Sequence, residues 1–306
     1  METSTTLTPG QREAVLALAE AAEASDGVDP LNEEARLQLR TGEARHWIAV
    51  AGDTDASGTD AGDAEPEGKT PPEESGGHAT VVGYATWQPA NATGQIVVHP
   101  AHRRRGHGTR LWKALASSAE APAVWAFGDL PAAQAFARAR GLAPTRGLHI
   151  MERALTNTEP PAAPEGVTLR GFTDADTEAV LAVNAAAFAN HPEQGHFSAA
   201  DLAARQAEDW WDPDGLILAE DTSGVVGFHW TKRHDATTGE VYVLGVHPRA
   251  AGRKLGALLL DAGLARLAAH GNSRVILYVD AGNDAAVRLY QRAGFTIVHT
   301  DTLYRA

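Results

Sequence analysis

The sequence predicts a mixed α/β (α+β) fold made of two copies of one domain. The chain has 306 residues, whereas a single domain commonly has ~100–200. EAVLALA at 13–19 returns as EAVLAVN at 178–184, and VHP at 98–100 returns at 246–248. A β-branched run precedes each VHP, and a basic, glycine-containing loop and a helical stretch follow it. These ordered matches indicate that a whole domain was duplicated.

Composition narrows the class of protein. Apolar residues make up 43% and charged residues 21% of the chain, which is typical of a soluble globular protein. A basic stretch followed by an apolar one is missing at the N-terminus, so we expect no secretion signal. The chain has no cysteine, which excludes disulfides and thiolate metal sites and fits a reducing cytoplasm. The net charge of -13 argues against nucleic-acid and membrane partners, because affinity for phosphate groups comes from clustered basic residues. Separately, we expect a monomer.

The two copies differ by an insertion. Their separation falls from 165 residues at the first match to 148 at the second, so the first copy holds 17 additional residues. Residues 53–78 contain eight acidic residues, one lysine and no large apolar side chain, and we expect a disordered loop there. The proline-rich segment 157–165 is the expected linker between an N-terminal domain, 1–156, and a C-terminal domain, 166–306.

Each half is expected to run helix, strands, loop, helix, strand, helix, strand. Thr8, Pro9 and Gln11 form a capping-box sequence that begins the first helix. Thr173 and Asp174 begin the equivalent helix of the second half.

The basic loops resemble anion-binding sites. A helix N-terminus presents unpaired N–H groups and a partial positive charge, and glycine lets a ligand approach closely. Residues Arg103 to Gly108 (RRRGHG) fit this pattern, and their arginines could add paired donors for phosphate oxygens. A flexible basic turn is the alternative, but the loop follows a β run and precedes a helix in both copies.

Two motifs together resemble the GNAT superfamily of N-acetyltransferases. One is Arg-x-x-Gly-x-Gly after a strand ending in Val-x-Pro, and the other is the segment from Asn283 to Phe295. The resemblance implies two tandem acyl-CoA N-acyltransferase domains that use acetyl-CoA and need no metal. It also implies that Asn283 contacts the cofactor and that Tyr290 protonates the departing thiolate. A core tyrosine on an amphipathic helix is the alternative for Tyr290.

The two halves are unequal at these motifs. Ala137 and Leu130 stand in the first half where Tyr290 and Asn283 stand in the second, so the first half is expected to be catalytically degenerate. In the second loop, Ala251 and Lys254 depart from the motif. If the backbone at Lys254 needs a positive φ, lysine costs ~1 kcal/mol or more there.

Amine attack on a thioester requires a neutral amine, so a carboxylate that accepts its proton is expected. Strand residues alternate between faces, which predicts that Glu240, Tyr242, Leu244 and Val246 share one face. Glu240 is therefore the candidate base, and a solvated glutamate at a strand end is the alternative.

Further strings resemble one tandem-domain, actinobacterial branch of the superfamily. They include AAFANHPEQGHF at 186–197, WWDPDGLILAE at 210–220 and GFHWTKRH at 227–234. That branch acetylates the cysteinyl amine of a cysteine–glucosamine–inositol pseudodisaccharide. By resemblance, the substrate contacts fall on Glu33, Glu193, Lys232, Glu240 and Tyr278. Glu34 competes with Glu33, because the match is loosest there.

The resemblance also implies acetyl-CoA contacts in both halves. In the second half they are Leu244, Gly245, Val246, Gly252, Arg253, Lys254, Leu255, Gly256, Ala257, Asn283, Asp284, Ala285, Ala286, Val287 and Arg288. In the first half they are Ile96, Val97, Val98, Arg104, Arg105, Gly106, His107, Gly108 and Thr109.

Other functions stay open at this point. One is a tandem acetyltransferase of another amine, such as an aminoglycoside or a peptide N-terminus. The other is a non-catalytic acetyl-CoA-binding protein, which Ala251 and Lys254 favour and which Asn283 and Tyr290 argue against.

Overall fold

A computed structural model describes residues 2–41, 44–52, 80–156, 158–189, 191 and 194–306. The predicted disordered insert, 53–78, and Glu193 lie outside these residues. The chain forms two compact units, one of Met1–Thr145 with Thr302–Ala306 and the other of Arg146–Asp301. No helix within the described residues is long and apolar enough to cross a membrane.

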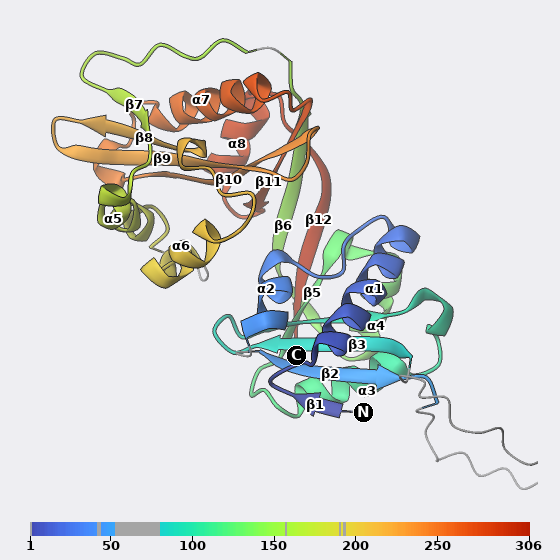
Figure 1. Ribbon diagram of the computed structural model, residues 1–306. Coiled ribbons are helices and arrows are strands. Elements are labelled where there is room, and N and C mark those ends of the chain that lie inside the picture. Colours follow the sequence, from blue (N-terminus) through green and yellow to red (C-terminus); the bar gives the residue numbers. More distant parts are fainter. Residues whose placement is uncertain (1, 42–43, 53–79, 157, 190, 192–193) are drawn as a thin grey trace, which may run out of the picture. The chain divides into compact units, whose positions relative to one another are not determined.

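The first unit is a sheet with helices on both faces (Figure 1). Its strands, in sheet order, are β1 (Glu2–Ser4), β2 (Arg45–Val50), β3 (Val81–Gln88), β4 (Thr93–Val98), β5 (Ala123–Ala126) and the end of β12 (Thr296–Arg305). Its helices are α1 (Pro9–Asp26), α2 (Glu33–Thr41), α3 (His107–Ala116) and α4 (Pro131–Ala139). Neighbouring strands are antiparallel except β4 and β5, which pair in parallel at Gly94 and Val124.

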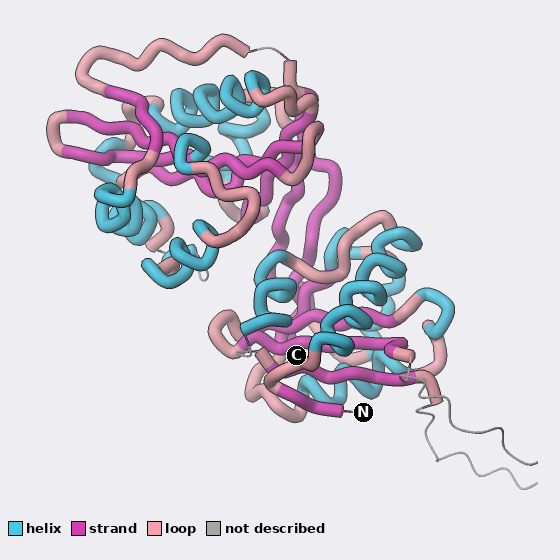
Figure 2. The backbone as a smooth tube through the Cα atoms, viewed as in Figure 1, coloured by secondary structure: helices cyan, strands magenta, loops and turns pink. Residues whose placement is uncertain are grey.

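The second unit repeats this plan. Its strands, in sheet order, are β6 (Ala143–Ala154), β11 (Arg274–Asp280), β10 (Thr238–Val246), β9 (Gly224–Arg233), β8 (Leu216–Asp221) and β7 (Thr168–Gly171). Its helices are α5 (Thr177–Ala187), α6 (Ala199–Gln206), α7 (Leu255–Ala269) and α8 (Asp284–Arg292). Helices α5 and α6 cover one face and α7 and α8 the other (Figures 1 and 2). Because β10 and β11 are parallel and β9 and β10 antiparallel, the sheet is mixed, which confirms the expected α+β fold.

Each sheet contains the final strand of the other sequence repeat. Residues 148–154 of β6 pair with β11 in the second unit, and residues 302–305 of β12 pair with β5 in the first. The compact units therefore divide the chain at 145/146 and at 301/302. The segment 157–165, expected as the linker between the repeats, follows β6, the last strand of the first repeat, and precedes β7, the first strand of the second. The division at this segment stays a prediction about the repeat.

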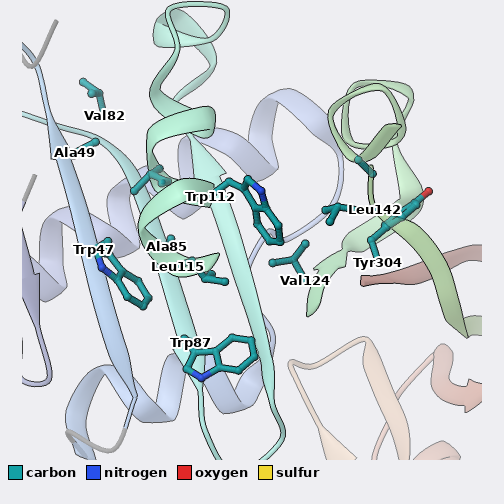
Figure 3. Packing of buried hydrophobic residues seen from close by; sticks show 12 residues of the cluster. Trp47, Ala49, Val82, Ala85, Trp87, Trp112, Leu115, Val124, Leu142 and Tyr304 are labelled. Atoms are coloured by element: carbon teal, nitrogen blue, oxygen red, sulfur yellow. The ribbon is translucent and has the colours of Figure 1, made fainter. Parts of the chain in front are cut away.

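The core of the first unit lies on both faces of its sheet. On the α3 side, Trp47 and Trp87 pack with Trp112 and Leu115 (Figure 3). On the α1 side, apolar residues of α1 and α2 pack on β2, β3 and β4. The capping box predicted at the start of α1 is confirmed, because Thr8 and Gln11 exchange backbone-to-side-chain hydrogen bonds of 2.9 and 3.2 Å.

A histidine is packed between β9 and α7 in the second unit. His229 is 0% exposed, and its Nδ1 donates to the backbone oxygen of Leu259 at 2.8 Å. Burial lowers the pKa of His229 to about 4, so the ring is neutral at neutral pH. The ring occupies the space beside Gly263, where a Cβ would lie 2.1 Å from ring atoms. The glycine therefore allows α7 to approach the sheet.

We predict that Gly263→Ala lowers the free energy of unfolding by about 3 kcal/mol, because the added methyl overlaps the His229 ring. Gly256→Ala is the control in the same helix, since its Cβ would meet its nearest atom at 3.6 Å. Urea unfolding compares the two variants with the parent chain. Equal midpoints for the two variants would contradict the predicted overlap.

Candidate active site

A β-bulge interrupts β10 where the candidate base lies. The register with β9 shifts between Val241 and Val243, so Tyr242 is an additional residue in the strand. Pairing of β10 with β11 covers Thr238 to Val241 and goes no further. A bulge bends a strand and increases its twist, so the second half of β10 diverges from β11. Its backbone groups on that side can then pair with an extended, amide-bearing ligand.

The bulge also changes which side chains share a face. The prediction that Glu240, Tyr242, Leu244 and Val246 face the same side was wrong. Tyr242 and Val243 both pack with the cluster beneath α5, whereas Leu244 and Val246 pack with the residues of α7. Strict alternation fails because the additional residue shifts the later positions to the opposite face.

Glu240 is buried and held by a histidine. Only 5% of the residue is exposed, and its Oε2 lies 2.6 Å from Nε2 of His234. In the antiparallel register, Glu240 is opposite Lys232 on β9. The alternative of a solvated glutamate at a strand end is therefore wrong, because the carboxylate is buried and its hydrogen-bond partner is a protein side chain.

Lys232 lies among aromatic rings on the same face. The residue is 9% exposed, and its Nζ lies 4.6 Å from the ring centroid of Trp210 and 5.2 Å from that of Tyr242. Such contacts stabilise a cation through the negative faces of the rings. The Tyr242 hydroxyl accepts a hydrogen bond from Nε of Arg205 at 2.8 Å, which fixes this ring.

Tyr278 adds an accessible aromatic to this face. Ile276 is opposite Glu240 in the parallel pairing, and Tyr278 follows two residues later on the same side. It is 48% exposed, whereas its neighbours in the strand, Leu277 and Val279, are buried on the opposite face. The structure therefore brings three of the predicted substrate residues, Lys232, Glu240 and Tyr278, to one face of the second sheet.

The remaining predicted substrate residues are not part of this group. Glu33 begins α2 in the first unit, and beside it Glu34 accepts a hydrogen bond from Gln38 at 2.9 Å. Both side chains are half-buried, so burial does not separate these competitors. Their contact with substrate stays a prediction, as does that of Glu193.

The two basic loops store backbone strain at equivalent positions. Before α7, Gly252 and Lys254 have φ values of 81° and 60°, and before α3, Arg104 and Gly106 have φ values of 62° and 85°. Lys254 therefore has a positive φ, which is the condition under which lysine carries a conformational cost. In each loop, one of the two positive-φ positions is a glycine and the other is a basic residue, and their order is reversed between the loops. Because a side chain destabilises the left-handed conformation, each loop carries this conformational cost once.

One arginine of each loop forms an ion pair within its own unit. Arg103 donates to both carboxylate oxygens of Asp26 at 2.8 and 2.6 Å, and Arg253 donates to Asp221 at 2.5 Å. In this structure Arg103 therefore directs its paired donors to Asp26, and phosphate contacts by the arginines of the loop stay a prediction. The backbone N–H groups of the first turns of α3 and α7 have no partner within the helix, which is the feature that favours anion binding.

Helix α8 carries the candidate acid. Tyr290 is 7% exposed, packs edge-on against Phe295, and belongs to the apolar cluster between the sheet and α7 and α8. Burial raises its pKa to about 12, so the phenol keeps its proton at neutral pH. Asn283 caps the helix, since its side chain accepts from the N–H of Ala286 at 3.1 Å.

The first unit differs at the two positions that the sequence singled out. Leu130 precedes α4 at the N-cap without a side-chain hydrogen bond, and Ala137 lies buried in that helix. These are the helix positions that Asn283 and Tyr290 occupy in α8. At these two positions, the first unit therefore lacks the capping amide and the phenol of the second.

Sequence reasoning missed His234 and the bulge at Tyr242. Both depend on β9 and β10 forming a hairpin, and the short polar segment between Arg233 and Thr238 was the available signal for it. Among the residues that the structure describes, no group of three His, Cys, Asp or Glu could hold a metal ion.

The acetyltransferase (GNAT) family matches this chain twice, over residues 39–142 and 185–295. The chain is 45% identical to the mycothiol acetyltransferase of Thermomonospora curvata, over 98% of this chain and 95% of the relative. It is 46% identical to the mycothiol acetyltransferase of Thermobispora bispora, over 97% of each chain.

Two solved structures are similar over the whole chain. A tandem GNAT protein from the clavulanic acid biosynthesis pathway has a TM-score of 0.71 at 19% identity, covering 100% of this chain and 98% of that chain. A GCN5-related N-acetyltransferase from Sphaerobacter thermophilus has a TM-score of 0.69 at 22% identity, covering 100% and 95%. These similarities support the tandem fold.

The double family match agrees with the two repeats of helix, sheet and basic loop described above. The chain is an acetyltransferase that uses acetyl-CoA. It belongs to the acetyltransferase (GNAT) family and, within that family, to the mycothiol acetyltransferases.

Proposed function

We propose that the second unit transfers acetyl from acetyl-CoA to the cysteinyl amine of a cysteine–glucosamine–inositol pseudodisaccharide, giving mycothiol and CoA. The names of the relatives at 45% and 46% identity support this substrate. The observation that carries the proposal is the pair of buried groups in one unit, Glu240 on β10 and Tyr290 on α8, with Ala137 in place of the phenol in the first unit.

Acetyl-CoA would bind where β10 diverges from β11. The amides of its pantetheine arm would pair with the open side of β10 at Leu244 to Val246, as an added strand does. Its pyrophosphate would lie at the start of α7, where Gly252 to Ala257 provide N–H groups and Lys254 provides a positive charge. The residues Asn283 to Arg288 at the start of α8 would line the same arm.

The chemistry uses the two buried groups in sequence. Glu240 accepts a proton from the acceptor's ammonium, directly or through water, and the neutral amine attacks the thioester carbonyl. As the tetrahedral intermediate collapses, the C–S bond breaks and Tyr290 donates its proton to the CoA sulfur. Its high pKa keeps the phenol protonated until the thiolate forms. The attacking nitrogen loses its second proton as the amide forms, and this proton returns through water to the Tyr290 phenolate, so that one proton, the one on Glu240, is released per turnover. Transfer is direct, without a covalent enzyme intermediate.

The acceptor offers many hydroxyl groups and one ammonium. Carboxylates and a lysine can bind such groups through charge-assisted hydrogen bonds. Lys232, Glu240 and Tyr278 would provide them from one face of the sheet. By the same resemblance, Glu193 and either Glu33 or Glu34 would complete the contacts.

The first unit is proposed to bind acetyl-CoA without catalysing transfer. Its loop from Arg104 to Thr109 and its strand residues Ile96 to Val98 correspond to the cofactor segments of the second unit. Leu130 and Ala137 lack the functional groups of Asn283 and Tyr290. Calorimetry would count bound acetyl-CoA: two per chain support this role, and one per chain contradicts it.

An assay with three acceptors tests the proposed function. The chain should acetylate the cysteinyl pseudodisaccharide at a kcat/KM at least a hundredfold above that for an aminoglycoside or a peptide N-terminus. A preference for either of the other amines would contradict the proposed substrate. Absence of transfer to all three would favour the non-catalytic alternative.

We expect Tyr290→Phe to lower kcat by about a hundredfold, because the departing thiolate then lacks its proton donor. Binding of acetyl-CoA should change little, since the ring remains. Tyr304→Phe is the matched control, because Tyr304 has a similarly raised pKa and its hydroxyl donates to Asp129 in the first unit. An unchanged kcat for Tyr290→Phe would exclude the phenol as the acid.

Glu240→Gln should lower kcat/KM for the acceptor about a hundredfold at neutral pH, because the amine then keeps its proton. The deficit should shrink as the pH rises toward the pKa of the amine, since the free amine then forms without a base. Glu152→Gln is the control, because Glu152 pairs with Arg274 and is more exposed. A deficit that stays constant with pH would argue against Glu240 as the base.

Lys254→Gly should raise the free energy of unfolding by about 1 kcal/mol, because the left-handed position no longer carries a side chain. The same change should weaken acetyl-CoA binding about threefold at low salt, because a charge near the pyrophosphate is lost. Arg104→Gly in the first unit is the matched variant. Tighter acetyl-CoA binding by Lys254→Gly would contradict the phosphate contact.

A further inference from the structure

His234 lies in the turn that joins β9 to β10, six residues before Glu240. Its backbone N–H donates to the oxygen of Thr238 at 3.0 Å. Asp235 fixes the same turn, because its Oδ1 accepts from the N–H groups of Thr237 and Thr238 at 2.6 and 2.8 Å. The turn is thus held by its own hydrogen bonds, and it presents the His234 ring in one place.

The ring contacts the carboxylate of the candidate base directly. Its Nε2 lies 2.6 Å from Oε2 of Glu240, and the side chains are 35% and 7% exposed. An ionised carboxylate can only accept hydrogen bonds, so Nε2 must carry the proton of this contact. Short, charge-assisted hydrogen bonds of this kind are stronger and more directional than neutral ones.

We propose that His234 is a positioning residue for Glu240: it holds Oε2 by a hydrogen bond and leaves Oε1 to meet the acceptor amine or its bridging water. This inference rests on the proposed role of Glu240 as the base. A buried carboxylate without a donor lacks a hydrogen bond to fix its orientation, so it would not direct Oε1 toward the amine.

The surroundings of Glu240 and His234 support these roles. Lys232, opposite Glu240, directs its Nζ over the rings of Trp210 and Tyr242. His234 also lines a cavity of about 290 Å³, so part of its ring is accessible while the carboxylate that it contacts is buried. The charged and titratable groups that line this cavity with it are Asp209, Asp212, Arg233, Asp235, Arg266 and His270.

Two substitutions separate positioning from simple packing. His234→Gln keeps an N–H donor at a similar reach, whereas His234→Leu keeps volume and removes the donor. His270→Leu is the matched control, because His270 lines the same cavity from the end of α7. All variants are tested in the full chain, after thermal unfolding shows that they fold.

We expect His234→Leu to lower kcat about thirtyfold, with the KM for acetyl-CoA within twofold of the parent. His234→Gln should stay within threefold of the parent, and His270→Leu should match it. The proposal is overturned if His234→Leu keeps its kcat. It is equally overturned if His234→Gln loses as much as His234→Leu, since a donor would then be insufficient.

A second measurement needs no acceptor. Carbon-13 NMR of labelled glutamate would follow the chemical shift of the Glu240 carboxyl at neutral pH, assigned with Glu240→Gln. His234→Leu should move this signal, because the carboxylate loses its hydrogen-bond donor, whereas His234→Gln and His270→Leu should leave it near the parent position. An unchanged signal in His234→Leu would refute the positioning role. If the parent fails to acetylate the pseudodisaccharide, the proposed function falls, and this measurement still decides whether His234 holds Glu240.

Discussion

The bulge at Tyr242 is the local constraint on which the arrangement of the second unit depends. One additional residue shifts the register between Val241 and Val243, and the parallel pairing with β11 ends at the same point. Before the bulge, Glu240 lies opposite Lys232 beneath α5 and α6. After it, Leu244 and Val246 face α7. A regular strand would place all of these side chains on one face and would keep its backbone paired along its whole length.

The two units show how one fold can be specialised at a few positions. Both loops adopt two left-handed residues before a helix, and each has one glycine and one basic residue there. The difference lies in the helix that follows the fifth strand of each repeat. In the first unit this helix begins with Leu130 and contains Ala137, whereas in the second it begins with Asn283 and contains Tyr290. Both loops therefore contain a strained residue, whereas only the second unit has a tyrosine at this helix position.

Much of the fold was accessible from the sequence because its signals are local. Each of these signals depends on residues that are close together in the sequence. They are the capping box at Thr8, the strand before each VHP and the helix from Asn283. The hydrogen-bond partners of the site residues were harder to predict from the sequence. The partner of Arg103 is Asp26, and the partner of Glu240 is His234 across a turn whose geometry sequence patterning does not define. The exchange of final strands between the two sheets has no local signal, since β6 and β11 are distant in sequence.

By itself, the sequence determined that the chain is a duplicated GNAT acetyltransferase, and it identified Glu240 and Tyr290 as the residues to examine. These conclusions follow from motif spacing, which covalent order preserves. Only the tertiary structure decided that Glu240 is buried and held by His234, that Leu244 lies on the opposite face, and that Arg103 is paired with Asp26. The physical reason is that burial, strand register and ion pairing depend on which distant segments meet, and one-dimensional spacing does not contain that information.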